Sequence, residues 1–160
     1  MKQLLAAATL CLAFAAPALA DGKIYVQLPD LSEFQGEDAE TMLKELILVN
    51  IAASNCAGQG ITDEEWSLLT DSADILARGQ LGLSIEDYDT TYFTPAFAEL
   101  DKPNACDQIG ARIQPMINLM VEFGGSVTAL PDQDAAYEAE QARNAAWDAE
   151  TTTPGKTKTK

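Results

Sequence analysis

Apolar residues recur at helical spacing through the middle of the chain. Between about Asp38 and Cys56 they follow one another at steps of three and four and cover most of the circumference of a helix. This pattern predicts a central, buried helix that Gly58 and Gly60 end. The residues of the stripe are Met42, Leu43, Leu46, Ile47, Val49, Ile51 and Ala53.

A capping box opens the next predicted helix. The hydroxyl of Thr62 can accept a hydrogen bond from the backbone, and the side chain of Glu65 can reach back to the amide of Thr62. Arg78 and Gly79 predict the end of this helix, because a cation favours the last carbonyls and glycine commonly follows the last turn. The expected buried face consists of Trp66, Leu69, Ala73 and Leu76.

Two shorter helices are expected after a connector over 79–83. Ser84 is a suitable N-cap for the first, which has acidic residues in its first turn. Thr94 and Pro95 form an N-cap and N1 pair, which predicts that a new helix of one or two turns begins there and runs to Leu100. This is the most aromatic part of the chain, with Tyr88, Tyr92, Phe93 and Phe97.

The last strongly apolar helix is predicted from about Asn104 to Phe123. Pro115 lies inside it and predicts a kink in the preceding turn, because proline removes an amide donor and crowds the carbonyl four residues earlier. Helical spacing favours core packing for the methionines here and for the aromatic residues before it. The alternative is a binding groove beside Pro115 and the short third helix. The apolar stripe is Cys106, Ile109, Ile113, Met116, Ile117 and Met120.

Three segments lie outside this apolar pattern. The β-formers over 24–28 and 126–130, each stopped by a proline, are consistent with a minor two-stranded β clasp, and the first segment could instead be an extended arm. The Ala- and Glu-rich stretch over 133–150 predicts a peripheral helix with a weak apolar face. The last ten residues, 151–160, have no apolar side chain to bury and are expected to form a disordered basic tail.

The first twenty residues have the pattern of a secretory signal peptide. Lys2 precedes an apolar run of 13 residues over 4–16, which is shorter than the roughly 20 residues that a membrane-spanning helix needs. Ala18 and Ala20 fit a cleavage site after Ala20, so the mature chain is expected to begin at Asp21 and to lose Cys11. We therefore expect a bacterial periplasmic or secreted protein without a membrane span.

Two cysteines remain after cleavage, Cys56 and Cys106. In an oxidising compartment an even pair predicts one disulfide, which would link the end of the first helix to the start of the fourth. Closing a loop of this length stabilises a fold by about 4 kcal/mol in the chain-entropy model. The predicted fold is a compact all-α domain of four to five helices over 21–132, stapled by this bond.

Composition excludes several classes of function. The chain has no histidine, so histidine triads and histidine-ligated zinc or haem are excluded. It contains no P-loop, dinucleotide fingerprint or nucleophile elbow, and its best calcium loop, from Asp87, has Tyr92 where glycine is required. No catalytic residue, metal or cofactor is predicted, and no nucleic-acid binding is expected, because the net charge is −15.

The one-sided charge suggests the function. Residues 21–150 hold six Lys and Arg against 25 Asp and Glu, a net charge of −19 that attracts cations. The main hypothesis is therefore a non-enzymatic chaperone, adaptor or inhibitor that binds a basic protein or peptide. A small carboxylate-dependent hydrolase or lytic enzyme is one alternative, and an acidic surface that serves only solubility is another. The candidate face for the cationic partner is Asp63, Glu64, Glu65, Glu86 and Asp87.

In outline, the predicted protein is similar to small periplasmic acid-stress chaperones. These are also short, exported, all-α and closed by one disulfide, and here Cys56 and Cys106 carry the likeness. The resemblance assigns no binding residues.

Overall fold

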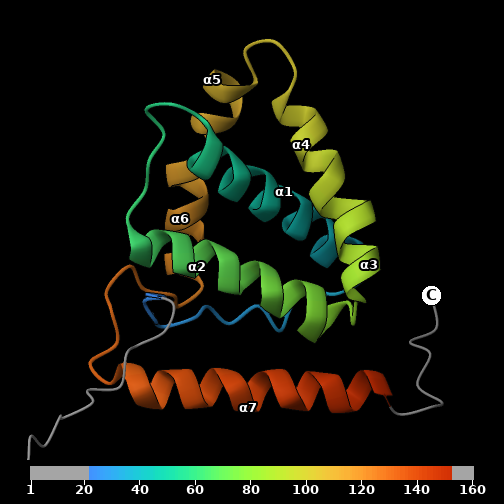
Figure 1. Ribbon diagram of the computed structural model, residues 1–160, viewed down its shortest axis with the longest axis vertical. Helices are drawn as coiled ribbons and strands as arrows, with labels where there is room; N and C mark the ends of the chain where they lie inside the picture. The colour runs from blue at the N-terminus through green and yellow to red at the C-terminus, as the bar shows by residue number, and fades with distance from the viewer. Residues whose placement is uncertain (1–21, 153–160) are drawn as a thin grey trace, which may run out of the picture.

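The computed structural model describes residues 22–152, and these residues form the predicted all-α fold (Figure 1). No strand occurs among them, and with α5 and α6 counted as one broken helix they make five helices. The predicted signal peptide over 1–20 lies outside the described residues. So does the predicted tail, except for Thr151 and Thr152, which extend the last helix.

α1 (Gly36–Asn55) is the centre of the core, as its apolar stripe predicts. It packs against α2, α4, α5 and α6. Leu43, Leu46 and Val49 are completely buried in these contacts. Removing such side chains from water is the main stabilising contribution, roughly 1.5 to 3 kcal/mol for each large apolar residue.

α2 (Asp63–Asp74) begins at the predicted capping box. The amide of Glu65 donates to Thr62 Oγ1 at 3.2 Å, and the amide of Thr62 donates to Glu65 Oε2 at 2.9 Å. Trp66 does not belong to the buried face, because it stands at the edge of that face and is 41 % exposed. Leu69, Ala73 and Leu76 are buried as predicted, and Leu68 is buried with them.

The helix ends at Gln80, one residue past the end predicted at Arg78 and Gly79, but these two residues have other roles. The helix continues as the π-helical turn η1 (Ile75–Gln80), in which the amide of Leu81 donates to the carbonyl of Leu76 at 2.9 Å. Arg78 does not cap the helix, because its guanidinium reaches across to the last helix. Gly79 allows the indole of Trp147 to approach closely, since a Cβ there would lie 3.3 Å from the ring and the ring would have to shift by a few tenths of an ångström.

α3 (Ile85–Tyr88), η2 (Asp89–Phe93) and α4 (Thr94–Leu100) form one continuous helix. Ser84 caps its start as predicted, because the amide of Asp87 donates to Ser84 Oγ at 3.0 Å. The predicted start at Thr94 and end at Leu100 match the bounds of α4, with Pro95 in its first turn, but Thr94 is not the N-cap and the helix is not interrupted there. The wide turn η2 lets the amide of Thr94 bond to the carbonyl of Asp89, five residues back, so the helix continues past Pro95.

The predicted fourth helix is two helices, α5 (Ala105–Gly110) and α6 (Ile113–Glu122). The predicted kink before Pro115 is thus a complete break at Ala111 and Arg112. The break places Pro115 in the first turn of α6, where the missing amide hydrogen costs no helical hydrogen bond. The sequence places the interruption correctly but underestimates its size.

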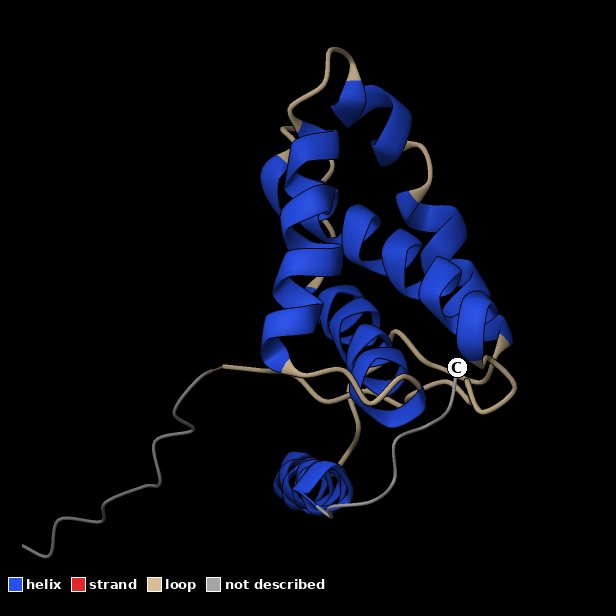
Figure 2. Cartoon of the chain, turned by 90° about the vertical axis from the view of Figure 1, so that its right-hand side faces the viewer, coloured by secondary structure: helices blue, strands red, loops and turns tan. Residues whose placement is uncertain are grey.

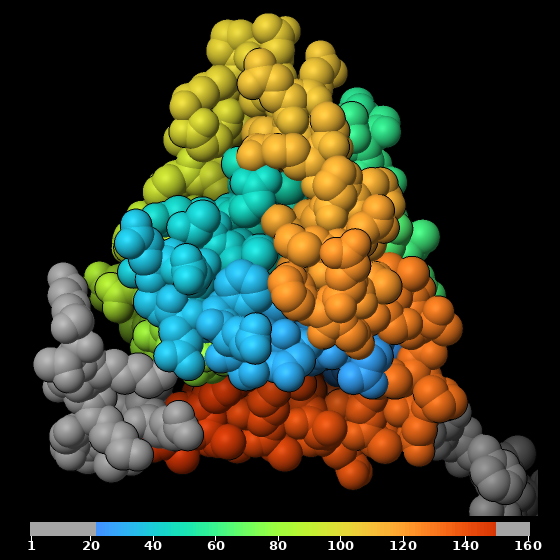
Figure 3. Space-filling view, turned by 180° about the vertical axis from the view of Figure 1, so that it is seen from behind, coloured from blue at the N-terminus to red at the C-terminus, as the bar shows by residue number. Residues whose placement is uncertain are grey.

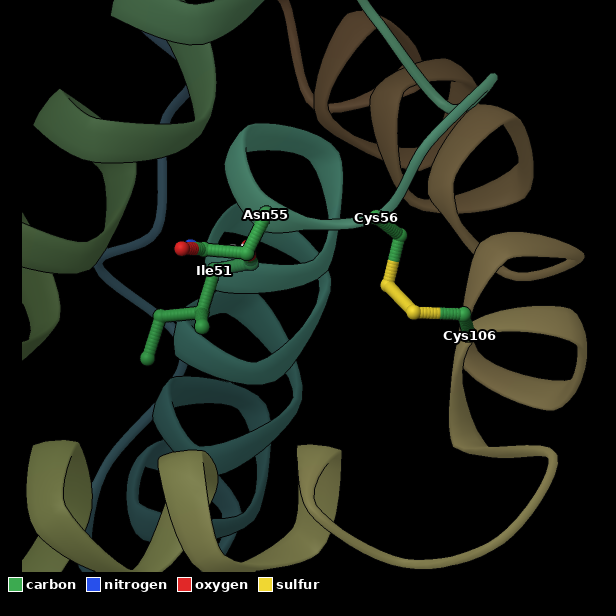
Figure 4. The surroundings of a disulfide bond; sticks show 4 residues. All are labelled: Ile51, Asn55, Cys56 and Cys106. Atoms are coloured by element: carbon green, nitrogen blue, oxygen red, sulfur yellow. Dashed lines mark hydrogen bonds between the residues drawn. A yellow bond between two sulfur atoms is a disulfide. The ribbon is translucent and has the colours of Figure 1, made fainter.

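The predicted disulfide is present and joins the end of α1 to α5 (Figure 4). Cys56 follows the last turn of α1, and its Cα lies 5.5 Å from the Cα of Cys106. The side chain of Asn55 donates to the carbonyl of Ile51 at 2.8 Å and so satisfies an acceptor in that last turn.

The predicted two-stranded clasp is not formed. Its two segments meet through a single antiparallel bridge between Val26 and Ala129. The amide of Leu130 donates to the carbonyl of Tyr25 at 2.8 Å, and the amide of Ser126 to that of Gln27 at 2.9 Å. The N-terminal segment therefore runs as an extended arm beneath α2.

α7 (Gln133–Thr152) lies on the far side of this arm, apart from the other helices (Figure 2). None of its residues up to Ala149 is buried. Its contacts with the arm and with η1 are made by polar and aromatic side chains. Tyr137, for example, meets the edge of Tyr25 with ring centroids 6.4 Å apart.

Candidate binding groove

A groove of about 560 Å³ opens between the start of α1 and α6. We call it the acidic groove. Figure 3 shows this face of the molecule, with residues 33–45 in blue and cyan beside α6 in orange. Its apolar lining is Phe34, Met42, Met116 and Phe123, and its polar lining is Glu33, Asp38, Thr41 and Glu45.

Helical spacing places one wall of the acidic groove. Asp38, Met42 and Glu45 recur at steps of four and three, so they share one face of α1. Glu33 and Phe34 come from the turn that precedes α1, in which the amide of Phe34 donates to the carbonyl of Leu31 at 3.1 Å. Because Leu31 is buried, this turn is anchored to the core.

The opposite wall is the length of α6. Met116 lies in its first turn, directly after Pro115, and Phe123 lies at its end. The rings of Phe34 and Phe123 meet edge to face at 5.3 Å between centroids, so the two walls touch at the floor. The amide of Asp30 also donates to the carbonyl of Phe123 at 2.8 Å. The floor is therefore preorganised.

The rim of the acidic groove carries three carboxylates and no cation among its lining residues. Glu45 accepts a hydrogen bond from Arg112 at 2.9 Å. Glu33 and Asp38 are exposed and form no ion pair with any described residue. Two acceptor groups with unit charge therefore remain available beside an apolar floor.

The structure separates the sequence-predicted acidic face into two clusters. Asp63, Glu64 and Glu65 lie in the first turn of α2, whereas Glu86 and Asp87 lie in the first turn of α3. The first cluster lies at the start of the helix formed by α2 and η1, and the second lies beyond its end (Figure 1). This helix is on the order of 25 Å long. None of the five residues lines the acidic groove.

Local hydrogen bonds occupy part of these two clusters. Glu65 is used twice, in the capping box and as acceptor from Gln114 at 3.2 Å. Asp87 accepts from Ser84 Oγ at 2.8 Å. Asp63, Glu64 and Glu86 keep side chains that form no hydrogen bond or ion pair within residues 22–152.

Most residues that line the acidic groove could not be recognised from the sequence. Glu33 and Phe34 stand in an irregular turn, where no periodicity marks them. The step of four from Asp38 to Met42 is a readable signal, but the pattern assigns Met42 to the core. The alternative groove beside Pro115 is the nearest prediction, since Met116 lines the cavity, although no residue of the short third helix does.

A second group of charges holds the arm and α7 together. Lys23 Nζ donates to Asp71 at 2.7 Å and also to Glu140, which accepts from Tyr25 OH at 3.1 Å. Asp71 is only 2 % exposed. Burial raises the pKa of Asp71, against the hydrogen bond from Lys23 that lowers it. Burial lowers the pKa of Lys23, but its two acidic partners raise it above the ordinary value.

No group of three or more residues of the metal-binding types could hold a metal ion among the described residues. No helix between residues 22 and 152 has the length and apolar character needed to cross a bilayer. The comparisons with protein-family models, with curated proteins and with solved structures find no match to this chain.

Proposed function

We propose that this protein is a non-enzymatic binding protein whose acidic groove holds a cationic, partly apolar segment of another protein or peptide. One observation carries the proposal: two unpaired carboxylates, Glu33 and Asp38, border a floor of aromatic and methionine side chains. Such a surface offers both ion pairing and apolar burial to the same ligand.

The floor supplies the attractive contact. Burial of apolar surface contributes roughly 25 cal/mol for each Å² removed from water. Met42 and Met116 have flexible, polarizable side chains, and methionine-rich surfaces adapt to ligands of different shape. The acidic groove therefore suits a class of amphipathic cationic segments better than one exact sequence.

The rim and the whole body supply selection by charge. A net charge of −19 over residues 21–150 draws basic partners toward the surface and repels acidic ones. These exposed charges are screened beyond about 8 Å at physiological ionic strength. Binding through this surface is consequently expected to weaken as salt rises.

The proposal places this binding outside the cytoplasm. The signal-peptide pattern over 1–20 predicts export, and the Cys56–Cys106 disulfide is typical of a periplasmic or secreted protein. A chaperone, an adaptor and an inhibitor would all use such a surface, and they differ in the partner they bind.

The test uses fluorescence anisotropy with a labelled amphipathic helix of lysine and leucine, and with its glutamate and leucine counterpart. We expect the lysine peptide alone to bind. The double variant Glu33→Gln, Asp38→Asn should bind it about tenfold more weakly at low salt, since each exposed ion pair contributes up to about 1 kcal/mol. The acidic peptide should not bind either protein.

The matched control is the double variant Asp63→Asn, Glu64→Gln. It removes the same number of exposed charges from α2, which does not line the acidic groove. It should retain binding within about twofold. Equal losses in the two double variants would show that only net charge matters, and a greater loss in the control would move the site to α2; either result rejects the acidic groove.

A further inference from the structure

A second, smaller pocket lies where η1 meets α3, away from the acidic groove. Its volume is about 130 Å³, several times the roughly 30 Å³ that one water occupies in the liquid. Asp74 and Arg78 contribute from one side, and Leu83, Ile85 and Tyr88 from the other. The pocket is thus large enough for the end of one long side chain.

Asp74 is the unexplained group in this pocket. It is partly buried, yet its carboxylate forms no hydrogen bond or ion pair with any residue in the described part of the chain. Asp71, one turn earlier, has the same chemistry but is held by Lys23 at 2.7 Å. Burial raises the pKa of Asp74, and the charge of Asp71 raises it further. A desolvated carboxylate of this kind favours a cationic partner.

Arg78 lines the pocket, and its charge lowers the pKa of Asp74, but its guanidinium is bound elsewhere. Its guanidinium donates to Asp148 at 2.6 Å and to Asn144 at 3.0 Å. It also lies over the ring of Trp147, 5.2 Å from the centroid. These contacts direct its donors toward α7, and no salt bridge joins it to Asp74.

Aromatic rings continue outward from the pocket along η2 and α4. Tyr88 and Phe93 stack with centroids 6.1 Å apart, and Phe93 meets Phe97 edge to face at 5.2 Å. The π-helical turn causes this alignment, because its wider winding brings a residue five positions later back to the same side. Phe93 and Phe97 stay 37 % and 39 % exposed, and Ile85 is 90 % exposed.

The charge around these rings is acidic. Residues 79–101 contain five Asp and Glu and no Lys or Arg. Aromatic faces attract ammonium and guanidinium groups, and the methylene stem of a long cationic side chain can cover exposed apolar surface. Rings, carboxylates and an apolar rim therefore favour the same ligand.

We infer that the pocket between η1 and α3 receives a single lysine or arginine side chain of a partner polypeptide. Its cationic head pairs with Asp74, and its stem lies along Ile85 and Tyr88. The neighbouring residues of the partner contact Phe93 and Phe97. This site shares no residue with the acidic groove and stands without it.

The test is an NMR titration of the ¹⁵N-labelled protein with N-acetyl-lysinamide, N-acetyl-argininamide and the uncharged isostere N-acetyl-norleucinamide. The two cationic amides should produce saturable shifts of the amides over 83–88. The norleucine derivative should produce none. Equal shifts with norleucinamide would mean an apolar pocket without cation recognition, and absence of shifts with both cations would overturn the inference.

The variant Asp74→Asn should bind the two cationic amides at least tenfold more weakly than the natural protein does. It should not destabilise the fold, because Asp74 forms no hydrogen bond or ion pair with residues 22–152 and burial disfavours its charge. The matched control Asp107→Asn removes an exposed acid of α5, which does not line the pocket, and should bind as the natural protein does. Unchanged binding by Asp74→Asn rejects the site. The variant Glu33→Gln, Asp38→Asn should bind the amides normally, which separates this outcome from failure of the acidic groove.

Discussion

Carboxylates in the first helices show how one residue type takes different roles within a short stretch of chain. Glu65 caps α2 by accepting from the amide of Thr62, so its role is local. Asp71 is buried and paired with Lys23, so it ties α2 to the arm. Asp74 is partly buried and unpaired in the described structure, so it is the one proposed to bind. Burial and partners, rather than residue type, separate these roles.

Tyr88 gives a prediction at the same scale. Burial, and then the charge of Asp74, raises the pKa of Tyr88 from 10.0 to about 12. Because the folded-state pKa exceeds the unfolded value, this tyrosine stabilises the fold fully below pH 10. The contribution is lost as pH rises toward 12. Tyrosinate absorbance at 295 nm should show a late phase near pH 12 that Tyr88→Phe lacks.

Chemical denaturation at pH 9 and pH 11.5 completes that test. The unfolding free energy should fall between the two values more in the natural protein than in Tyr88→Phe. Tyr92, whose pKa is also raised by burial, is present in both proteins and serves as the common background. An identical fall in both would contradict the assigned environment of Tyr88.

At the scale of elements, the disulfide joins the two parts of the core that the apolar pattern marks most clearly. The double variant Cys56→Ser, Cys106→Ser should lose up to about 4 kcal/mol of unfolding free energy, because the unfolded chain regains the freedom of a loop of 50 residues. Far-UV circular dichroism at 25 °C should change little, since α1 keeps its contacts with α2, α4 and α6.

The natural protein reduced with dithiothreitol is the matched control for this variant. It should show the same drop in stability, which separates loss of the bond from the cost of placing serine at the buried position of Cys56. Unchanged stability on reduction would mean that the bond contributes nothing to the fold. Loss of the helical signal would mean that the helices depend on it.

Helix starts and the positions of interruptions were predictable from the sequence, whereas the form that each interruption takes was not. Thr62 and Ser84 mark starts because capping depends on residues three positions apart. Pro95 and Pro115 have the same local chemistry but different outcomes. A π-helical turn before Pro95 lets the helix continue, whereas the helix before Pro115 ends at a turn and a new helix begins. α4 and α6 both pack against α1, and no local pattern contains these tertiary contacts.

The candidate site was less predictable than the fold. Its apolar floor combines Phe34, from an irregular turn, with Met116 and Phe123, which lie some 80 residues later. Periodicity assigns a methionine to a core without showing where the core ends. The aromatic residues over 88–97 were likewise expected in the core. Of these only Tyr92 is buried, and Phe93 and Phe97 are exposed.

On the scale of the whole molecule, the acidic groove and α7 use different parts of the surface. α7 contacts the arm and η1, where Glu140 and Asp148 pair with cations of the body. None of its residues from Gln133 to Ala149 lines the acidic groove. The apolar floor is therefore open in the described structure, and the net negative charge of the body favours cationic segments there.

Methionine methyl NMR tests this central claim most directly. The described residues contain three methionines: Met42 and Met116 line the acidic groove, Met116 with only 7 % of its surface exposed, and Met120 is completely buried. The lysine and leucine peptide should shift the ¹³C-methyl signals of Met42 and Met116 and leave that of Met120 in place, with the shifts decreasing as salt rises. Binding of the peptide without movement of the Met42 and Met116 signals would contradict the account.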